Sequence, residues 1–255
     1  MPGTPRIWVG GLPFVATSIS DATTWLLETA ARDHLPVNVR LANAYNVALA
    51  DSDPSYHDLM RDRGINFPDG TPVVWAMRMR SRKAGVRPGR VRGPSLFVDA
   101  LERSASLGTQ HFLLGSTPDT LAKLQTEIAS RYPGVTIAGS YSPPFAAIDD
   151  DYIADCATRV REVDADVVWM GLGTPKQDVL GTALADAVGR TTVNVGAAFD
   201  YVAGTVREAP PWIQRSGFEW LYRLLAEPRR LWKRYLIGNI RFLIAVVHNG
   251  KTQNA

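Results

Sequence analysis

The stretch DVVWMGLGTPKQDVLGTALADAV, residues 166–188, decides the fold of this chain. Its apolar run VVWM leads through a glycine-containing turn into a segment with apolar residues at helical spacing. A strand that is apolar at successive positions is typical of a sheet covered on both faces, and a strand that leads directly into a helix is typical of a βαβ unit. The stretch therefore predicts a parallel sheet with helices on both faces.

The same alternation runs through the first two hundred residues. Further strands are expected at RIWV (6–9), VNVRLA (37–42), HFLLG (111–115), VTIAGS (135–140) and TTVNVGA (191–197). Helical spacing predicts helices over 22–33, 94–107, 119–132, 151–163 and 176–188. We therefore predict an α/β fold with a doubly wound, largely parallel, Rossmann-like sheet over residues 1–205, followed by a basic helical appendage over 206–255.

Composition narrows the class of protein. A chain of 255 residues with 45% hydrophobic residues can bury a sizeable core. The single cysteine, Cys156, excludes an internal disulfide, and the four histidines show no metal-ligand spacing. We expect no metal and no bound cofactor. The N-terminus lacks the pattern of a signal peptide, and the apolar run FLIAVV (242–247) is too short to span a bilayer.

Basic residues are concentrated in the tail. From Trp212 onward there are eight lysines and arginines against two acidic residues, although the whole chain has a net charge of only +3. Tryptophans and leucines are interleaved with these arginines, a composition typical of interfacial amphipathic helices. Core-docked helices with solvated arginines are the alternative. The charge excess favours an anionic membrane surface, and no nucleic-acid-binding motif accompanies it.

Three loops that follow predicted strands are candidate ligand sites, because ligands of open α/β sheets bind beyond the carboxyl ends of the strands. In LLGSTPDT (113–120), the backbone at Gly115 and Ser116 could bind an anion at a helix N-terminus. In NVGAAFDYVAGTVREAPPWI (194–213), Asp200 follows small residues that would let a ligand approach. The third loop suits a nucleotide diphosphate, and its candidate residues are Gly171, Gly173, Thr174, Pro175, Lys176 and Gln177. Ordinary strand-to-helix turns are the alternative at each position.

The stretch NFPDGTPVVW (66–75) places Asp69 in a Pro-Asp-Gly turn ahead of a helix that Thr71 and Pro72 would begin. Asp69 is therefore either a turn residue or an acid held at the rim of a cleft. The following segment, SRKAGVRPGRVRGP (81–94), is predicted to be a mobile loop. Its arginines could be solvated or could bind phosphate, and we favour solvation for Arg87 and ligand binding for Arg92.

Several motifs together resemble the WecG/TagA/CpsF glycosyltransferase family (glycosyltransferase family 26). They occur in the family's order and cover nearly the whole chain: PDGTPVVW, VRGPS, GSTPDTL, YPGVTIAGSYSPPF, GLGTPKQD, VGAAFDYVAGTVREAP and FEWLYRLLAEPRRLWKRYLIGN. The resemblance implies an inverting, metal-independent transfer of a sugar from a nucleotide diphosphate donor, UDP-linked, to a polyprenyl-diphosphate-linked saccharide. It also implies a cytoplasmic protein, peripherally attached to the inner face of the plasma membrane, that makes cell-envelope polysaccharide or exopolysaccharide. The sequence leaves the oligomeric state open, a homo-oligomer included.

The resemblance also implies roles for particular residues. The aspartate of the PDG motif, here Asp69, is the expected catalytic base, and Asn43 helps to line the catalytic site. Gln177 belongs to the donor site, and candidates to meet the diphosphate are Arg215, Arg223 and Arg230. An inverting displacement needs one carboxylate to take the acceptor's proton and cations to stabilise the departing diphosphate, so this set is chemically sufficient.

The chain departs from the family pattern at three positions. Glu208 stands where many relatives have arginine, so the cation expected there is missing unless Arg207 replaces it. Ser95 and Asp178 replace an acid and a glutamate, respectively. These changes leave the donor sugar open: an N-acetylmannosamine-like sugar, its uronate or a hexose. Two other functions compete: an NAD(P)-dependent Rossmann oxidoreductase, which the incomplete glycine fingerprint disfavours, and a non-catalytic peripheral membrane module.

Overall fold

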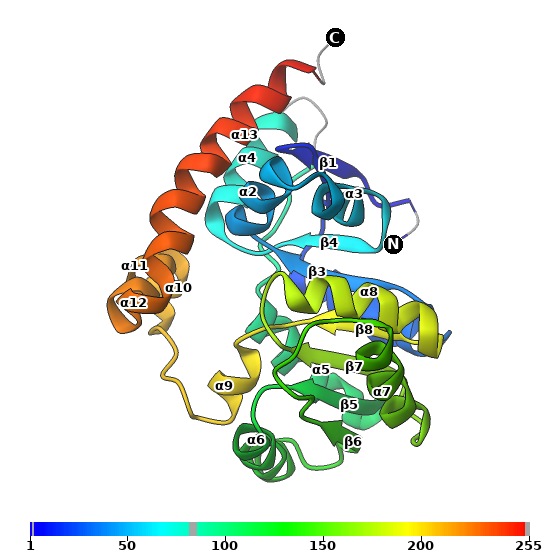
Figure 1. Ribbon diagram of the computed structural model, residues 1–255. Coiled ribbons are helices and arrows are strands. Elements are labelled where there is room, and N and C mark those ends of the chain that lie inside the picture. Colours follow the sequence, from blue (N-terminus) through cyan, green and yellow to red (C-terminus); the bar gives the residue numbers. More distant parts are fainter. Residues whose placement is uncertain (2, 82–85, 253–255) are drawn as a thin grey trace.

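A six-stranded, all-parallel sheet forms the centre of the computed structural model, which describes residues 1, 3–81 and 86–252 (Figure 1). The strand order is β4-β3-β8-β7-β5-β6. The strands are β3 (Asn38–Ala42), β4 (Ile65–Pro68), β5 (Gln110–Gly115), β6 (Thr136–Tyr141), β7 (Val167–Gly171) and β8 (Thr191–Asn194). The predicted doubly wound α/β fold is confirmed.

Helices cover both faces of the sheet. On one face lie α1 (Ile19–Trp25) with its π-helical continuation η1 (Leu26–Ala31), α5 (Gly93–Leu107), α6 (Pro118–Arg131) and α9 (Ala198–Val202). On the other face lie α7 (Asp150–Arg161) and α8 (Lys176–Val188). Strand β7 shows why its sequence is apolar at successive positions. Val167 and Trp169 join the core on the first face, whereas Val168 and Met170 join the core on the second.

The N-terminal segment forms a separate two-stranded hairpin. RIWV is strand β1 (Arg6–Val9), but it pairs antiparallel with β2 (Leu12–Val15) and does not enter the parallel sheet. Gly10 and Gly11 both have positive φ, as a two-residue hairpin turn requires. Strands β2 and β4 were not predicted, because both are only four residues long and contain a proline.

A third core lies beneath this hairpin. It contains residues of α2 (Ala44–Ser52), α4 (Thr71–Ser81) and the last helix, and α3 (Pro54–Asp62) contributes Tyr56 and Met60. Asn43 begins α2 by accepting a hydrogen bond from the backbone N–H of Tyr45, and Asp53 caps α3 in the same way through Ser55 and Tyr56. Helix α4 begins at Thr71, where the sequence predicted its start.

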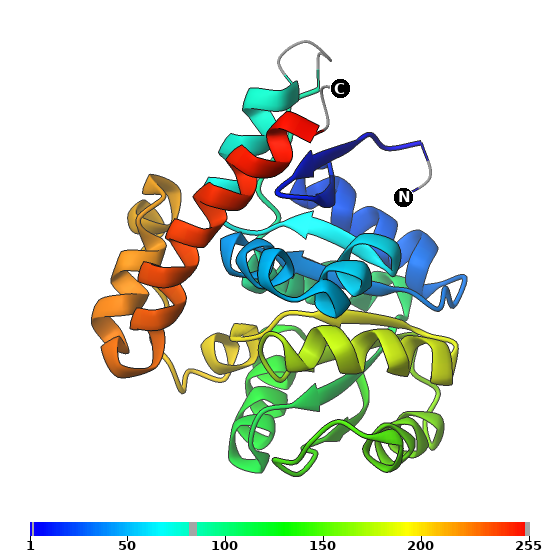
Figure 2. The same cartoon turned by 45° about the horizontal axis from the view of Figure 1, so that its top comes forward.

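The C-terminal region is a chain of short helices that ends in a long one. It consists of α10 (Pro211–Ser216), α11 (Glu219–Ala226), α12 (Pro228–Trp232), the π-helical η2 (Lys233–Ile237) and α13 (Gly238–Thr252). Figures 1 and 2 show α13 running beside α2 and α4, and Phe242 and Ala245 are buried in the core with Val9 and Leu12. None of the helices in the described residues is long and apolar enough to cross a membrane.

Candidate functional site

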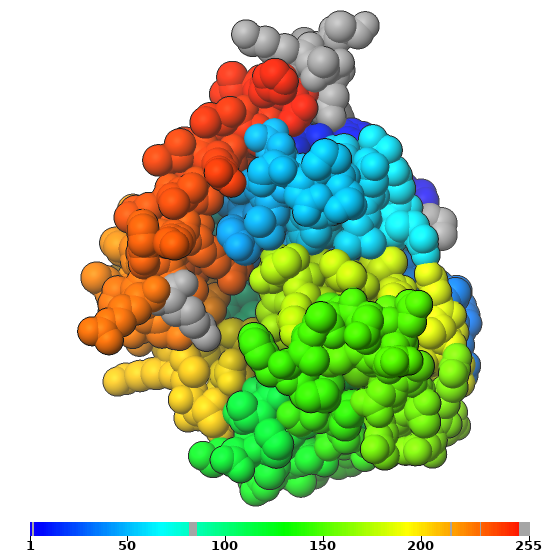
Figure 3. Space-filling model, viewed as in Figure 1, coloured from blue at the N-terminus to red at the C-terminus, as the bar shows by residue number. Residues whose placement is uncertain are grey.

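A cavity of about 490 Å³ lies at the carboxyl ends of β3, β4, β7 and β8. Its walls are the loops that follow these strands and, on the opposite side, α11, η2 and the start of α13. Figure 3 shows the corresponding hollow between the orange C-terminal helices and the green and yellow part of the molecule. The position matches the general rule for open α/β sheets, and the volume suits a small-molecule ligand.

Asp69 lies in the wall of this cavity directly after β4. Its backbone N–H donates to the carbonyl of Ala42 at 2.9 Å, which ties the residue to the end of the neighbouring strand β3. No hydrogen bond among the described residues ends on its carboxylate, and Arg90 Nε is 3.8 Å from Oδ1. Burial raises the pKa of Asp69, while the positive charge of Arg90 opposes that rise. The carboxylate is therefore available to a ligand in the cavity.

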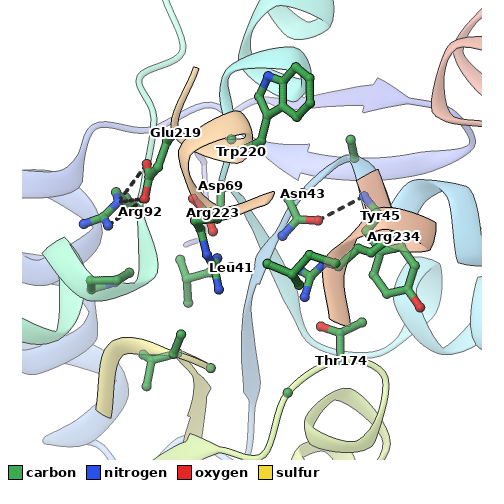
Figure 4. Close-up of a pocket in the computed structure, with 18 of the residues that line it drawn as sticks. Leu41, Asn43, Tyr45, Asp69, Arg92, Thr174, Glu219, Trp220, Arg223 and Arg234 are labelled. Carbon is green, nitrogen blue, oxygen red and sulfur yellow. Dashed lines mark hydrogen bonds and ion pairs between the residues drawn. The ribbon is translucent and has the colours of Figure 1, made fainter. Parts of the chain in front are cut away.

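Asn43 lies beside Asp69, at the end of β3. Its Oδ1 accepts from Tyr45 N at 3.0 Å, and its own N–H donates to Asn46 Oδ1 at 3.0 Å, a reciprocal cap that fixes the start of α2 (Figure 4). The side-chain oxygen is thus committed to the helix. The Nδ2 amide is the group that Asn43 can offer to a ligand, because this residue lines the cavity.

The loop between β7 and α8 forms the floor of the cavity. Gly171, Gly173, Thr174 and Gln177 line it. Gln177 Oε1 accepts from Gly173 N at 3.1 Å, so the side chain closes the loop that its own helix follows. Pro175 does not line the cavity, and Lys176 contacts the Ala146 carbonyl and the ring of Phe145 instead.

Of the other two predicted loops, one lines the cavity and one does not. Asp200 lines the cavity on α9, next to Tyr201. Gly115 and Ser116 do not line the cavity. They lie at the end of the neighbouring strand β5, where Ser116 N donates to the Gly171 carbonyl of β7 at 3.2 Å. The structure therefore places the Gly115 loop next to the floor of the cavity and outside its wall.

The C-terminal helices bring arginines over the cavity. Arg223 of α11 lies 5.8 Å from the ring centroid of Tyr201, and Arg234 of η2 lies 4.8 Å from that of Tyr45. Figure 4 shows both arginines reaching into the space that Asp69 also faces. The Nε of Arg234 is buried and has no hydrogen-bond partner among the described residues. The pKa of Arg234 is lowered by burial, so an anion in the cavity would relieve the cost of this charge.

Sequence reasoning missed Arg234, and the only available signal was its place in the motif EPRRLWKRY. Arg215 and Arg230 were predicted to meet the diphosphate. Both lie on helices of the C-terminal region, but their side chains are outside the described part of the structure.

Arg92 is held between two carboxylates. Only 7% of it is exposed, and its guanidinium donates to Glu219 Oε1 from Nε at 3.0 Å and from Nη2 at 2.7 Å. Its Nη1 contacts Glu208. Glu208 is therefore engaged in an ion pair with Arg92, and Arg207 does not replace the expected cation, because it is exposed and does not line the cavity.

The segment that carries Arg92 packs against the body of the protein wherever the structure describes it. Residues 82–85 lie outside the described residues, so the predicted mobile loop is not described there. From residue 86 onward the segment contacts the body of the protein: Val91 N donates to the Pro68 carbonyl at 2.9 Å and Gly89 N to the Thr17 carbonyl at 3.0 Å. Arg87 is exposed, as predicted.

Beneath the floor, Asp178 of α8 is hydrogen-bonded to three other elements, α2, α3 and β8. It is 1% exposed and accepts hydrogen bonds from Tyr56 Oη at 2.8 Å, Asn194 Nδ2 at 2.9 Å and Asn46 Nδ2 at 3.3 Å. Burial raises the pKa of Asp178, and these hydrogen bonds oppose the rise. The residue thus links α8 to the end of β8 and to the helix that Asn43 begins. No cluster of three His, Cys, Asp or Glu that could hold a metal is found in the described residues.

Comparison with known proteins finds a matching family and a relative of known activity. The model of the glycosyl transferase WecG/TagA/CpsF family matches residues 7–255. The chain is also 26% identical over 232 residues to the N-acetylglucosaminyldiphosphoundecaprenol N-acetyl-beta-D-mannosaminyltransferase of Bacillus subtilis (strain 168), covering 89% of this chain and 86% of that protein.

Proposed function

This chain belongs to the WecG/TagA/CpsF family of glycosyl transferases, and from that premise we propose the reaction that its cavity performs. A sugar moves, with inversion, from a nucleotide diphosphate donor to a saccharide linked to polyprenyl diphosphate. We take N-acetylmannosamine as the transferred sugar, following the relative's name as an N-acetylmannosaminyltransferase, and UDP as its carrier, following the expectation from the sequence motifs. The alternative function, an NAD(P)-dependent oxidoreductase, is compatible with the sheet, but the family assignment does not support it.

Asp69 is the base in this proposal. The acceptor hydroxyl oxygen attacks the anomeric carbon, the bond from that carbon to the phosphate oxygen breaks, and the diphosphate leaves with the bonding electron pair. Asp69 takes the hydroxyl proton. The observation that carries the proposal is a carboxylate without hydrogen bonds from the described residues, in a cavity wall that also carries arginines. Its raised pKa improves it as a base, because a base is most effective when its pKa is near the working pH.

The arginines of the C-terminal helices would stabilise the leaving diphosphate. Arg223 and Arg234 line the same cavity as Asp69, and Arg234 has a buried Nε without a partner among the described residues. Gly173 and Gln177 on the floor would hold the rest of the donor. Residues 206–255 thus complete the site of the domain formed by residues 1–205. Charge on the departing phosphate is neutralised by groups already in place, which is how preorganised cations lower a barrier.

We also propose that this protein binds an anionic membrane surface, where a polyprenyl-linked acceptor resides. What supports this is the surface of the C-terminal helices, where exposed cations (Arg229, Lys233 and Arg241) alternate with exposed apolar side chains. The exposed apolar residues are Trp212, Phe218, Leu221, Leu225, Trp232, Leu236, Ile237, Ile240, Leu243, Ile244 and Val247. Trp75 and Met79 of α4 are exposed as well, so the apolar surface extends beyond the tail.

The substitution Asp69→Asn tests the reaction. Asparagine keeps the shape and the turn but cannot take a proton, so transfer should fall by roughly 10² to 10⁴ while folding survives. The measurement is transfer of radiolabelled sugar from UDP-N-acetylmannosamine to a polyprenyl-diphosphate-linked N-acetylglucosamine, with thermal unfolding as the control. Near-native turnover of the Asn variant would remove Asp69 from the mechanism and leave Asp200, which lines the same cavity, as the acid to test.

A further inference from the structure

We propose that Glu219 is a positioning residue that holds the Arg90 guanidinium on the C-terminal helices and so prevents Arg90 from pairing fully with Asp69. The inference rests on the proposed role of Asp69 as the base. It gives the C-terminal region a role other than substrate binding, namely to keep Arg90 from forming a full ion pair with the base.

The evidence lies in how Arg90 uses its nitrogen atoms. Its Nη2 donates to Glu219 Oε2 at 2.5 Å, and its Nη1 donates to the Gln214 carbonyl at 2.8 Å. Both partners belong to the C-terminal region. The Nε that faces Asp69 is buried, lies 3.8 Å from Oδ1 and makes no hydrogen bond within the described residues. Arg90 is thus held short of hydrogen-bond distance from the base.

Arginine is well suited to this arrangement because its donors are fixed in one plane. A guanidinium whose two outer nitrogens are held on one side cannot turn to form a bidentate pair on the other side. Glu219 itself is only 13% exposed in its side chain, and it also accepts hydrogen bonds from Nε and Nη2 of Arg92. The pKa of Glu219 is lowered because these arginines outweigh the cost of its burial, so it remains charged at neutral pH.

Removing the Glu219 charge has two effects on Asp69, and both favour the charged carboxylate. The negative field of Glu219, which raises the pKa of Asp69, disappears. The ion pair that holds Arg90 Nη2 is also lost, so the guanidinium, still tied to the Gln214 carbonyl, can move closer to Asp69. A full pair with arginine lowers a carboxyl pKa by about 1–3 units. The other charges that face Asp69 are Arg92, Arg223 and Arg234. Arg223 and Arg234 form no ion pair with Glu219 in the described residues, so they set the starting value. Arg92 loses one of its two carboxylate partners, which adds to the first effect.

The experiment is to titrate Asp69 in Glu219→Gln by carbon-13 NMR of the labelled carboxyl group, with the resonance assigned by its absence from Asp69→Asn. We expect the pKa of Asp69 to fall by about one unit or more. The acid limb of the kcat/KM profile should move to lower pH by the same amount. The plateau rate should decrease, because a weaker base takes the proton less readily.

Glu208→Gln is the matched control. It removes a second carboxylate from the same arginine cluster but leaves both ties of Arg90 in place, so the titration of Asp69 should stay within a few tenths of a unit. An unchanged titration in Glu219→Gln, or an equal shift in Glu208→Gln, would overturn the proposal.

A second variant protects the test against misfolding. Arg90→Gln combined with Glu219→Gln removes both partners of this pair, and Arg92 keeps Glu208 as a carboxylate partner, so no buried charge is left without one. Adding Glu219→Gln to Arg90→Gln should then shift Asp69 by less than half of what it does in the native background. Equal shifts in the two backgrounds would show that Glu219 does not act through Arg90. Failure of the proposed function looks different, since Asp69→Asn would then retain activity and its acid limb.

Discussion

Gln177 shows how one side chain serves both structure and function. It is only 6% exposed, and its Oε1 closes the loop by accepting from Gly173 N. An amide at this position fixes the loop that forms the cavity floor and can present its Nε2 to a ligand. The loop geometry therefore depends on the side chain and not on glycine content alone.

We expect Gln177→Ala to weaken UDP binding by about tenfold, because about one hydrogen bond to the loop and one to the donor are lost. Isothermal titration calorimetry with UDP measures the effect. Gln125→Ala is the control, since the side chain of that glutamine donates to the Leu121 carbonyl of its own helix, away from the cavity. An unchanged dissociation constant for Gln177→Ala would move the donor away from this loop.

At the scale of elements, the site depends on polar groups that join strand ends below the cavity. Arg40 is fully buried on β3 and donates to Asn38 Oδ1 at 2.8 Å and to Asn66 Oδ1 at 3.1 Å. Asn38 in turn donates to Asn194 Oδ1 at 3.0 Å. These bonds connect β3, β4 and β8, and Asp178 extends the connection to α8 and α2. The loops that line the cavity therefore have a common base.

Asp178→Asn should destabilise this protein by about 1–3 kcal/mol. The new NH₂ group replaces either Oδ2, which accepts from Tyr56 and Asn46, or Oδ1, which accepts from Asn194, so at least one buried donor loses its acceptor. Urea unfolding measures the loss. Asp186→Asn, an exposed position on the same helix, should change the free energy of unfolding by less than about 0.5 kcal/mol. Equal stability of the two variants would contradict the role of Asp178.

At the scale of the whole molecule, the C-terminal region is both a cover for the cavity and part of the core. Phe242 and Ala245 are buried against the N-terminal hairpin, and the Arg80 guanidinium donates to the Val246 carbonyl at 2.9 Å. Deleting the tail would therefore expose apolar core as well as remove the cationic surface. Substitutions of exposed residues are the sharper test of membrane binding.

Leu225→Glu combined with Leu243→Glu should weaken binding to anionic vesicles at least tenfold. The two leucines are 74% and 62% exposed, so the change removes apolar contact and adds charge without disturbing the core. Sedimentation with phosphatidylserine-containing vesicles measures binding. Leu107→Glu, at a 49% exposed leucine where α5 ends, is the control. If the double variant sediments like the native protein, the membrane surface lies elsewhere.

The sequence by itself determined the layered α/β architecture, because periodicity and continuous apolar strands are local properties that burial on two faces imposes. It also indicated Asp69 and the 171–177 loop, since turn and helix-start chemistry is written in adjacent residues. Only the tertiary structure decided which groups meet. The pairing of Arg92 with Glu208 and Glu219, the restraint of Arg90 and the approach of Arg234 to Tyr45 join residues more than one hundred positions apart. Such contacts follow from how helices dock, and no local pattern encodes a docking geometry.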